Sequence, residues 1–203
     1  MHFNFRLSEL ATAAALLLTL LVGSPQLAAA ERGQTVLVVG DSLSAAFGIA
    51  QEESWVALLG ERLQTKGYGY AVVNASITGD TTTGGLKRLP RALDLHRPAV
   101  VIIELGGNDG LRGTPIEVVR SNLARMIELS KGAGARVVLA GIQIPTNYGG
   151  PYTRAFAGVY PELAKQYRIG LVDFILDGVA LDINLFQADG IHPNARAQPI
   201  LLD

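Results

Sequence analysis

A histidine near the end of the chain lies in surroundings typical of a catalytic base. His192 follows Asp189 by three residues in a turn shaped by glycine and proline, so the carboxylate is able to reach the ring and fix its tautomer. The other ring nitrogen would then accept a proton from a nucleophile. The remaining histidines are poorer candidates, because His2 lies in a leader-like segment and His96 precedes a predicted strand. The competing interpretation is that Asp189 only caps the start of a helix.

Ser42 is the nucleophile that best fits this base. It lies in the segment GDSLS at residues 40–44, whose small residues leave backbone amides accessible. The chain contains no cysteine, which excludes a thiol nucleophile, disulfides and thiolate metal sites. Ser44 and Ser76 are rival nucleophiles, and we expect Ser44 in a first helical turn and Ser76 in a loop turn. The segment lacks the second glycine of the G-x-S-x-G elbow, which argues against an α/β-hydrolase.

An acyl-transfer site also needs N–H groups that stabilise a negatively charged oxygen. We expect two backbone donors, the amide of Ser42 and the amide of Gly79, which has no side chain to block it. The third expected donor is the side-chain amide of Asn108, and the weaker alternative for this residue is a turn position without a catalytic role. The chain order serine, aspartate, histidine is one of the known orders of catalytic triads. Triad and donors together predict a serine hydrolase.

Acidic residues in the same loops favour a second hypothesis, a metal-dependent phosphoesterase. A two-metal site usually needs more than one histidine ligand, so this hypothesis ranks below the first. A nucleotide-binding module is disfavoured, because a glycine occupies the lysine position of the phosphate-loop-like segment 79–85. A lipid carrier without catalysis would leave the Asp–His pair unexplained. The residues that would hold metal are Asp41, Asp80, Asp109, Asp189 and His192.

Five short runs of Val, Ile and Leu predict the strands that position these residues. The runs are nearly continuous rather than alternating, which is typical of strands buried on both faces of a parallel sheet. In such sheets ligands bind beyond the carboxyl ends of the strands, where all the candidate residues fall. The predicted strands are Thr35–Val39, Tyr70–Asn74, Ala99–Glu104, Arg136–Ala140 and Gly170–Phe174.

Helical patterns fill the gaps between these runs, and the alternation predicts a doubly wound α/β sandwich with right-handed crossovers. The clearest helix should begin with Thr114 as its cap, Pro115 in the first turn and Glu117 completing a capping box. A second pattern is interrupted by Pro90. The predicted helices are Ser54–Lys66, Thr82–Asp94, Thr114–Lys131 and Thr153–Tyr167.

Composition bounds the class of protein. The 203 residues are 49% hydrophobic and 17% charged, which suits one globular domain. The formal net charge is −1 without a basic cluster, so nucleic acid is not an expected partner. Residues 1–30 contain an apolar Ala/Leu run and a small-residue cleavage site, which predicts a secretory signal peptide and export, with a single domain over 31–203. Few residues follow Asn194, so we expect a last helix that is cut short. A separate expectation is that the protein is a monomer.

The four chemistry-bearing segments resemble the conserved blocks of the GDSL/SGNH hydrolase family. GDSL at 40–43 resembles the first block, Gly79 the second, GGND at 106–109 the third and DGIH at 189–192 the last. The resemblance implies that Ser42 is the nucleophile and that Gly79 and Asn108 are oxyanion donors. It also implies a flavodoxin-like three-layer α/β/α sandwich with a five-stranded parallel sheet.

Longer matches resemble one branch of that family, which holds arylesterases and periplasmic thioesterases with protease and lysophospholipase activity. They are NASI at 74–77, ELGGNDGLRG at 104–113 and DGIHPN at 189–194. This implies cleavage of esters or thioesters without cofactor or metal, and a mobile loop at Gly110–Pro115 that closes over acyl chains. Members of the branch have a longer last helix. The expected substrate-binding residues are Asp41, Leu43, Gly110, Leu111, Pro145 and Tyr148.

Overall fold

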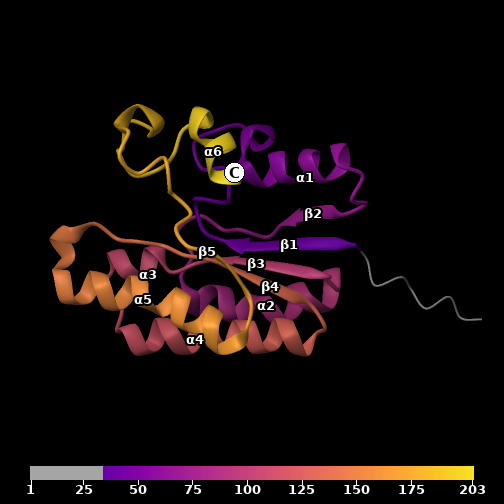
Figure 1. Ribbon diagram of the computed structural model, residues 1–203, viewed down its shortest axis with the longest axis horizontal. Coiled ribbons are helices and arrows are strands. Elements are labelled where there is room, and N and C mark those ends of the chain that lie inside the picture. Colours follow the sequence, from indigo (N-terminus) through magenta and orange to yellow (C-terminus); the bar gives the residue numbers. More distant parts are fainter. Residues whose placement is uncertain (1–33) are drawn as a thin grey trace, which may run out of the picture. The chain divides into compact units, whose positions relative to one another are not determined.

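A parallel sheet forms the middle of the part of the chain that the computed structural model describes, residues 34–203 (Figure 1). Its strands are β1 Thr35–Gly40, β2 Ala71–Asn74, β3 Val100–Glu104, β4 Arg136–Ala140 and β5 Gly170–Val172. They lie in the order β2-β1-β3-β4-β5, and each neighbouring pair is parallel. Leu37, Val38 and Val39 of β1 are fully buried, as expected for a strand covered on both faces. The predicted parallel sheet is confirmed.

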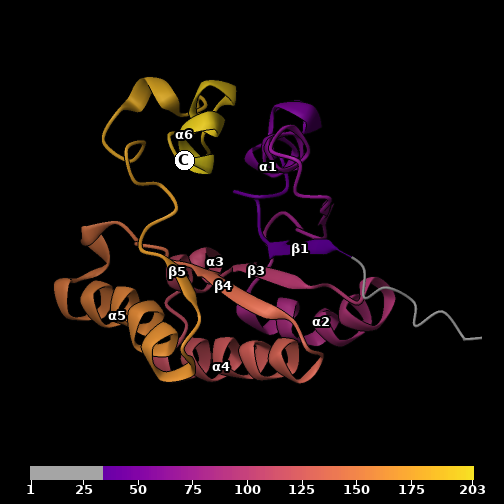
Figure 2. The same cartoon turned by 45° about the vertical axis from the view of Figure 1, so that its right-hand side comes forward.

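Helices cover both faces of this sheet. They are α1 Trp55–Thr65, α2 Thr82–His96, α3 Gly107–Leu111, α4 Ile116–Gly132, α5 Gly150–Tyr167 and α6 Gln198–Leu202. Figures 1 and 2 show α1 and α6 on one face, and α2, α4 and α5 on the other. On the second face α4 packs against both α2 and α5. The doubly wound α/β sandwich predicted from the strand–helix alternation, and the three layers that the family resemblance implies, are therefore confirmed.

Two apolar cores hold the layers together. The larger one lies between the sheet and α2, α4 and α5, and includes the fully buried Leu105, Leu123 and Phe156. The smaller one includes Trp55 of α1 and Leu201 of α6. Because apolar burial on both faces fixes the sheet, the loops beyond its strands start from defined positions. These loops carry the candidate site.

The start of α4 differs from the prediction. The helix begins at Ile116 after Pro115, and no side chain caps it, so the predicted Thr114 capping box is wrong. The Thr114 N–H donates instead to the Asp109 carbonyl at 2.9 Å, and its own carbonyl accepts the Tyr152 hydroxyl at 2.8 Å. The backbone of Thr114 is thus engaged by α3 and α5, and the Pro115 carbonyl accepts the first helical N–H, from Val118.

Three other predictions need adjusting. Helix α2 continues through Pro90 to His96, anchored by the buried Leu89 and Leu93. Strand β5 ends at Val172 rather than at 174, because the chain bends at the next residue. The short helix α3 was not predicted, and it includes the first two residues of the expected mobile loop at 110–115.

The predicted signal peptide lies outside the described residues. Within residues 34–203, no helix has both the length and the apolar character needed to cross a membrane.

Candidate active site

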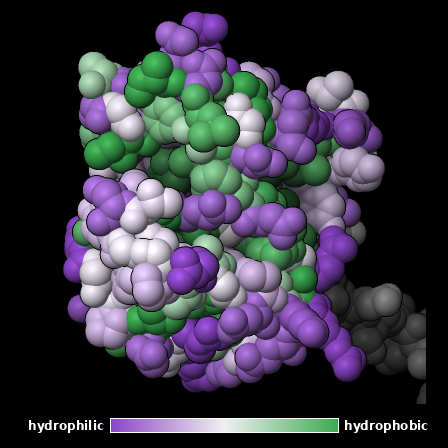
Figure 3. Space-filling view, turned by 60° about the vertical axis from the view of Figure 1, so that its left-hand side comes forward, coloured by the Kyte–Doolittle hydropathy of each residue, from purple (hydrophilic) through white to green (hydrophobic). Residues whose placement is uncertain are grey.

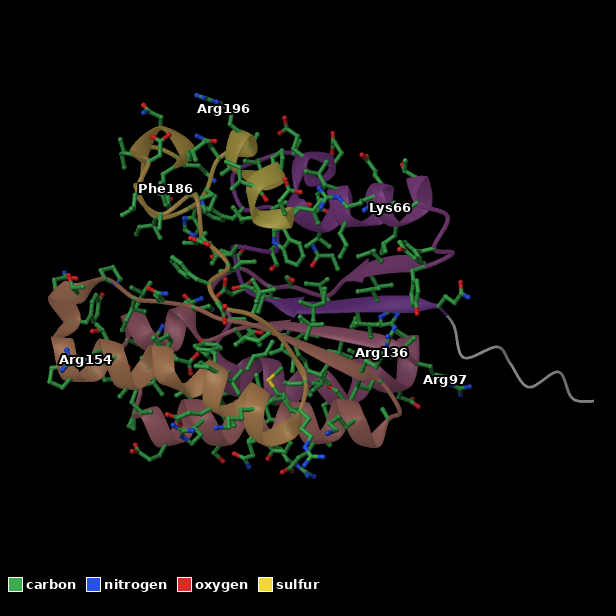
Figure 4. All side chains as sticks on the ribbon, in the orientation of Figure 1. Lys66, Arg97, Arg136, Arg154, Phe186 and Arg196 are labelled. Carbon is green, nitrogen blue, oxygen red and sulfur yellow. The ribbon has the colours of Figure 1, made fainter. Side chains whose placement is uncertain are left out.

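The carboxyl ends of β1, β2 and β3 bring three of the predicted loops together. The Ala75 N–H donates to the Val38 carbonyl at 2.8 Å, and the Ile77 N–H donates to the Gly40 carbonyl at 3.0 Å, so the loop after β2 continues alongside the end of β1. Figure 4 shows this edge on the side of Phe186, with Arg97 and Arg136 at the opposite edge. All candidate residues therefore come from one edge of the sheet.

Ser42, His192 and Asp189 form a continuous hydrogen-bonded chain. The Ser42 Oγ lies 2.9 Å from His192 Nε2, and His192 Nδ1 lies 2.7 Å from Asp189 Oδ2. The second oxygen, Asp189 Oδ1, accepts the backbone N–H groups of Ile191 and His192 at 2.9 and 3.0 Å. The structure thus brings together the three residues that the sequence pattern selected, in the geometry of a nucleophile, a base and a group that orients the base.

These hydrogen bonds determine the charge on Asp189. The backbone N–H of His192, and next its ring, stabilise the carboxylate and lower the pKa of Asp189 to about 2. Because the ionised form is favoured, the carboxylate accepts a proton-bearing Nδ1 and leaves Nε2 directed at the serine. The alternative that Asp189 merely caps a helix does not fit, because no helix starts in this turn.

Phe47 and Gln187 support the histidine, and sequence reasoning missed both. The Phe47 and His192 rings lie with centroids 4.3 Å apart at 41°. Gln187 Nε2 donates to the carbonyl oxygens of Phe47 and Pro193 at 2.7 and 3.1 Å, and the Gln187 N–H donates to the His192 carbonyl at 2.8 Å. Gln187 thereby ties the loop after β1 to the turn that carries the histidine. No motif marks either residue, since the contact that joins Gln187 to Phe47 spans 140 residues.

The expected oxyanion donors lie beside the serine loop. Asn108 is the second residue of α3, and its Nδ2 donates to Asp41 Oδ2 at 3.1 Å. Gly79 has a φ of +78°, and an added Cβ would meet no atom within 4 Å, so its surroundings are open. The left-handed φ favours glycine there for backbone reasons as well as for access. The Asn108 amide has a second N–H beyond the one that it donates to Asp41.

The expected substrate contacts separate into two groups. Leu111, Pro145 and Tyr148 are exposed, and Figure 3 shows apolar surface gathered on the side of the molecule toward which these loops project. Gly110 is buried, with an added Cβ only 2.6 Å from Ile144, so it packs inward.

Asp41 and Leu43, the other two expected contacts, also turn inward. Asp41 is 2% exposed, and its carboxylate accepts the Leu43 N–H at 3.1 Å as well as the Asn108 side chain. The Leu43 side chain packs against the larger core. Both residues are better placed to support the loop than to touch a substrate.

The rival serines are engaged elsewhere. Ser44 is fully buried and donates to Glu104 at 2.7 Å; it lies in a run of turns rather than in the predicted helical turn. The backbone N–H of Ser76 donates to its neighbour Asn74 at 3.0 Å, and its Oγ is buried without a hydrogen-bond partner. Of the three serines, Ser42 is the one in contact with a histidine.

The carboxylates required by the metal hypothesis have separate protein partners. Asp80 pairs with Arg88 at 2.7 Å, and Asp109 accepts the N–H and hydroxyl of Thr82 at 2.8 and 2.7 Å. In residues 34–203 no group of three or more histidine and acidic side chains is placed to hold a metal ion. The geometry therefore gives the metal hypothesis no support.

Glu104 is a buried acid that sequence reasoning also missed. Its Oε2 accepts the Ser44 hydroxyl at 2.7 Å and the Asp41 N–H at 3.3 Å, while Oε1 is buried without a partner. Burial raises the pKa of Glu104 well above its usual value, and the adjacent Asp41 raises it further. Burial also raises the pKa of Asp41 to about 6. An acid ending an otherwise apolar strand was the signal that could have identified it.

This pair should make the protein less stable as the pH rises. A carboxyl group with a raised pKa in the folded state keeps its proton there, so the folded state is favoured below about pH 4 and loses that advantage as the pH rises through about 6. We expect the pair to lower the free energy of unfolding by on the order of 2 kcal/mol between about pH 4 and pH 7. Urea denaturation at several pH values measures this.

Glu104→Gln should reduce that pH dependence, because the neutral amide removes one of the two carboxyl groups whose pKa burial raises in the folded state. Glu117→Gln, on the exposed surface of α4, is the matched control and should follow the wild type. If the free energy of unfolding falls with pH as steeply in Glu104→Gln as in the wild type, the effect does not come from this pair.

Comparison with known proteins identifies the family. Residues 38–199 match the GDSL-like Lipase/Acylhydrolase family. The chain is 54% identical over 170 residues to Esterase TesA of Pseudomonas aeruginosa, covering 84% of this chain and 85% of that protein. It is 44% identical over 174 residues to Thioesterase 1/protease 1/lysophospholipase L1 of Escherichia coli K12, covering 86% of this chain and 82% of that protein.

Solved structures agree with the sequence matches. A crystal structure of TesA superposes with a TM-score of 0.81 at 54% identity, covering 83% of this chain and 93% of that one. The psychrotrophic esterase EstA from Pseudoalteromonas, inhibited by monoethylphosphonate, gives 0.80 at 39% identity, covering 84% of this chain and 93% of that one. The sheet order, the three layers and the sequence match over most of the chain lead to the same conclusion: this protein belongs to the GDSL-like lipase/acylhydrolase family.

Proposed function

We propose that this protein is an exported serine hydrolase that cleaves carboxylic esters and thioesters through an acyl-enzyme on Ser42. The observation that carries the proposal is the 2.9 Å contact between Ser42 Oγ and His192 Nε2, together with the 2.7 Å contact between His192 Nδ1 and Asp189 Oδ2. The relatives named esterase, arylesterase and thioesterase support the same reaction class. The apolar and small-residue pattern of residues 1–30 supports export.

In the proposed reaction, His192 takes the proton of Ser42 as the oxygen attacks the acyl carbonyl carbon. The carbonyl oxygen becomes an anion, which the amides of Ser42 and Gly79 and the side chain of Asn108 stabilise. As the tetrahedral intermediate collapses, His192 gives its proton to the leaving alcohol or thiol and the acyl-serine remains. Water, deprotonated by His192, then attacks the acyl carbonyl carbon of the acyl-serine. As the bond to Ser42 Oγ breaks and the acid is released, His192 returns the proton to the Ser42 oxygen and the free enzyme is restored.

The substrate class follows from the surface beside the serine. Four large apolar side chains in the segments at this edge are exposed: Phe47, Leu111, Tyr148 and Ile191, at 41%, 39%, 40% and 55%. An exposed apolar surface next to the nucleophile suits the acyl chain of an ester better than a charged substrate. Aryl esters, acyl-thioesters and lysophospholipids are the candidate substrates, with small aryl esters as the simplest probes.

Covalent labelling tests this function. An organophosphonate should react once per chain, and mass spectrometry should locate the adduct on the peptide that contains Ser42. The rate of nitrophenyl ester hydrolysis should fall in proportion to the fraction of labelled protein, for each acyl length in a series of esters. Full activity in a completely labelled protein, or loss of activity to a chelator without any labelling, would overturn the proposal in favour of the metal-dependent alternative.

A further inference from the structure

Arg88 on α2 binds three acceptors that belong to the edges of the candidate site. Its Nε donates to Asp80 Oδ2 at 2.7 Å, and Nη2 donates to the Gly40 carbonyl at 3.2 Å. The Nη1 group donates to the carbonyl oxygen of Ala75. The side chains of Arg88 and Asp80 are 21% and 11% exposed, so the charge pair is largely shielded from solvent. No step of the proposed reaction uses Arg88 directly.

The three acceptors lie close in sequence to the two backbone amides that are expected to stabilise the oxyanion. Gly40 is the last residue of β1 and precedes Ser42 by two positions. Ala75 follows β2, and Asp80 is the residue directly after Gly79. One guanidinium thus connects the backbone leading into Ser42 with both ends of the loop that contains Gly79. The Ile77 N–H adds a direct bond to the Gly40 carbonyl at 3.0 Å.

The same end of α2 also contacts the residue next to the third expected donor, Asn108. Thr82, the first residue of the helix, donates its N–H and its hydroxyl to the carboxylate of Asp109 at 2.8 and 2.7 Å. Asp109 is buried and directly follows Asn108. Side chains from the first two turns of α2 therefore contact all three loops that supply oxyanion donors.

We propose that Arg88 is a positioning residue for the oxyanion hole, fixing the spacing between the amides of Ser42 and Gly79. This inference rests on the proposed function, because it assumes that those amides stabilise the anion. Oxyanion donors act by being preorganised, so a small displacement weakens binding of the transition state more than binding of the ester. Three acceptors in different directions suit the planar guanidinium fork and not a lysine ammonium.

Substitution of Arg88 should therefore affect kcat more than KM. For nitrophenyl ester hydrolysis we expect Arg88→Gln to lower kcat by roughly 10–100-fold, with KM changed by less than about threefold. Arg88→Lys should show a similar loss, because it keeps the charge and loses the fork. Arg91→Gln, an exposed position one turn away on the same helix, is the matched control and should retain wild-type kinetics.

Two further measurements separate positioning from a general loss of structure. An aryl boronic acid forms a tetrahedral anion on an active serine, so its affinity should fall in Arg88→Gln by about the same factor as kcat. Added guanidinium ion, at concentrations below those that unfold the protein, should restore part of the kcat of Arg88→Gln and leave Arg91→Gln unchanged. If Arg88→Gln does not fold, Arg88→Lys decides the test by the same kinetics and boronate binding.

The outcomes distinguish this inference from the function on which it rests. If Ser42→Ala is inactive while folded Arg88→Gln keeps wild-type kcat and boronate affinity, the positioning role is overturned and the proposed function stands. A rise in KM with unchanged kcat would overturn it equally. Hydrolysis retained in Ser42→Ala would overturn the proposed function, and this inference with it.

Discussion

Replacing Ser42 with alanine should abolish ester hydrolysis while leaving the fold intact. The hydroxyl is the group that would form the acyl-enzyme, and it donates to His192 Nε2 at 2.9 Å. The two rival serines do not replace it, because Ser44 donates to Glu104 and the Ser76 hydroxyl is buried in a loop turn. We expect kcat to fall by on the order of 10⁴–10⁶-fold, to the rate that binding and oxyanion donors alone provide. Initial rates with a nitrophenyl ester, at high protein concentration, measure the residual activity.

Ser76→Ala is the matched control, because it removes a hydroxyl from a rival position in a neighbouring loop. Its Oγ has no hydrogen-bond partner, so the variant should keep both its activity and its thermal stability. Ser42→Ala should also melt close to the wild type, since its hydroxyl contacts only a side chain at the surface of the site. Turnover by Ser42→Ala within tenfold of the wild type would refute the acyl-enzyme mechanism.

The sequence predicted the parts of the molecule whose signals are local. Strand positions came from apolar runs, because strands covered on both faces need them whatever their order in the sheet. The residues of the triad came from short motifs, since a turn of four residues is enough to place Asp189 against His192. The position of Ser42 against His192 was predicted from topology, because both lie after strands of a parallel sheet.

The residues that were missed act through contacts distant in sequence. Glu104 meets Ser44 across 60 residues, and Arg88 meets Gly40 across 48. Such contacts depend on strand order and register, which no single motif encodes. The failed Thr114 cap has this origin only in part: its carbonyl accepts the Tyr152 hydroxyl across 38 residues, while its N–H donates to the Asp109 carbonyl of the preceding helix α3. Local rules identified the reacting groups, and tertiary contacts determine how they are supported.

Replacing Asp189 with asparagine should lower kcat by on the order of 10³–10⁴-fold with little change in KM. The carboxylate holds His192 through a 2.7 Å bond to Nδ1, and its pKa of about 2 keeps it ionised at every pH at which an imidazole base would work. The amide of asparagine is neutral and is able to donate to Nδ1, which would stabilise the wrong tautomer and leave Nε2 protonated against Ser42.

Two measurements identify the cause of that loss. Phosphonate labelling of Ser42 should slow in parallel with kcat, because both need the base, whereas Asp177→Asn, an exposed acid in an earlier part of the same loop region, should behave as the wild type. The second measurement is the pH dependence of the free energy of unfolding. A carboxyl group with a lowered pKa in the folded state adds stability above about pH 4, and that stability is lost as the pH falls toward 2. Asp189→Asn should therefore unfold with less pH dependence in that acidic range than the wild type does. A variant that labels at the wild-type rate would show that His192 is oriented without Asp189, and that Phe47 and Gln187 are sufficient to hold the ring.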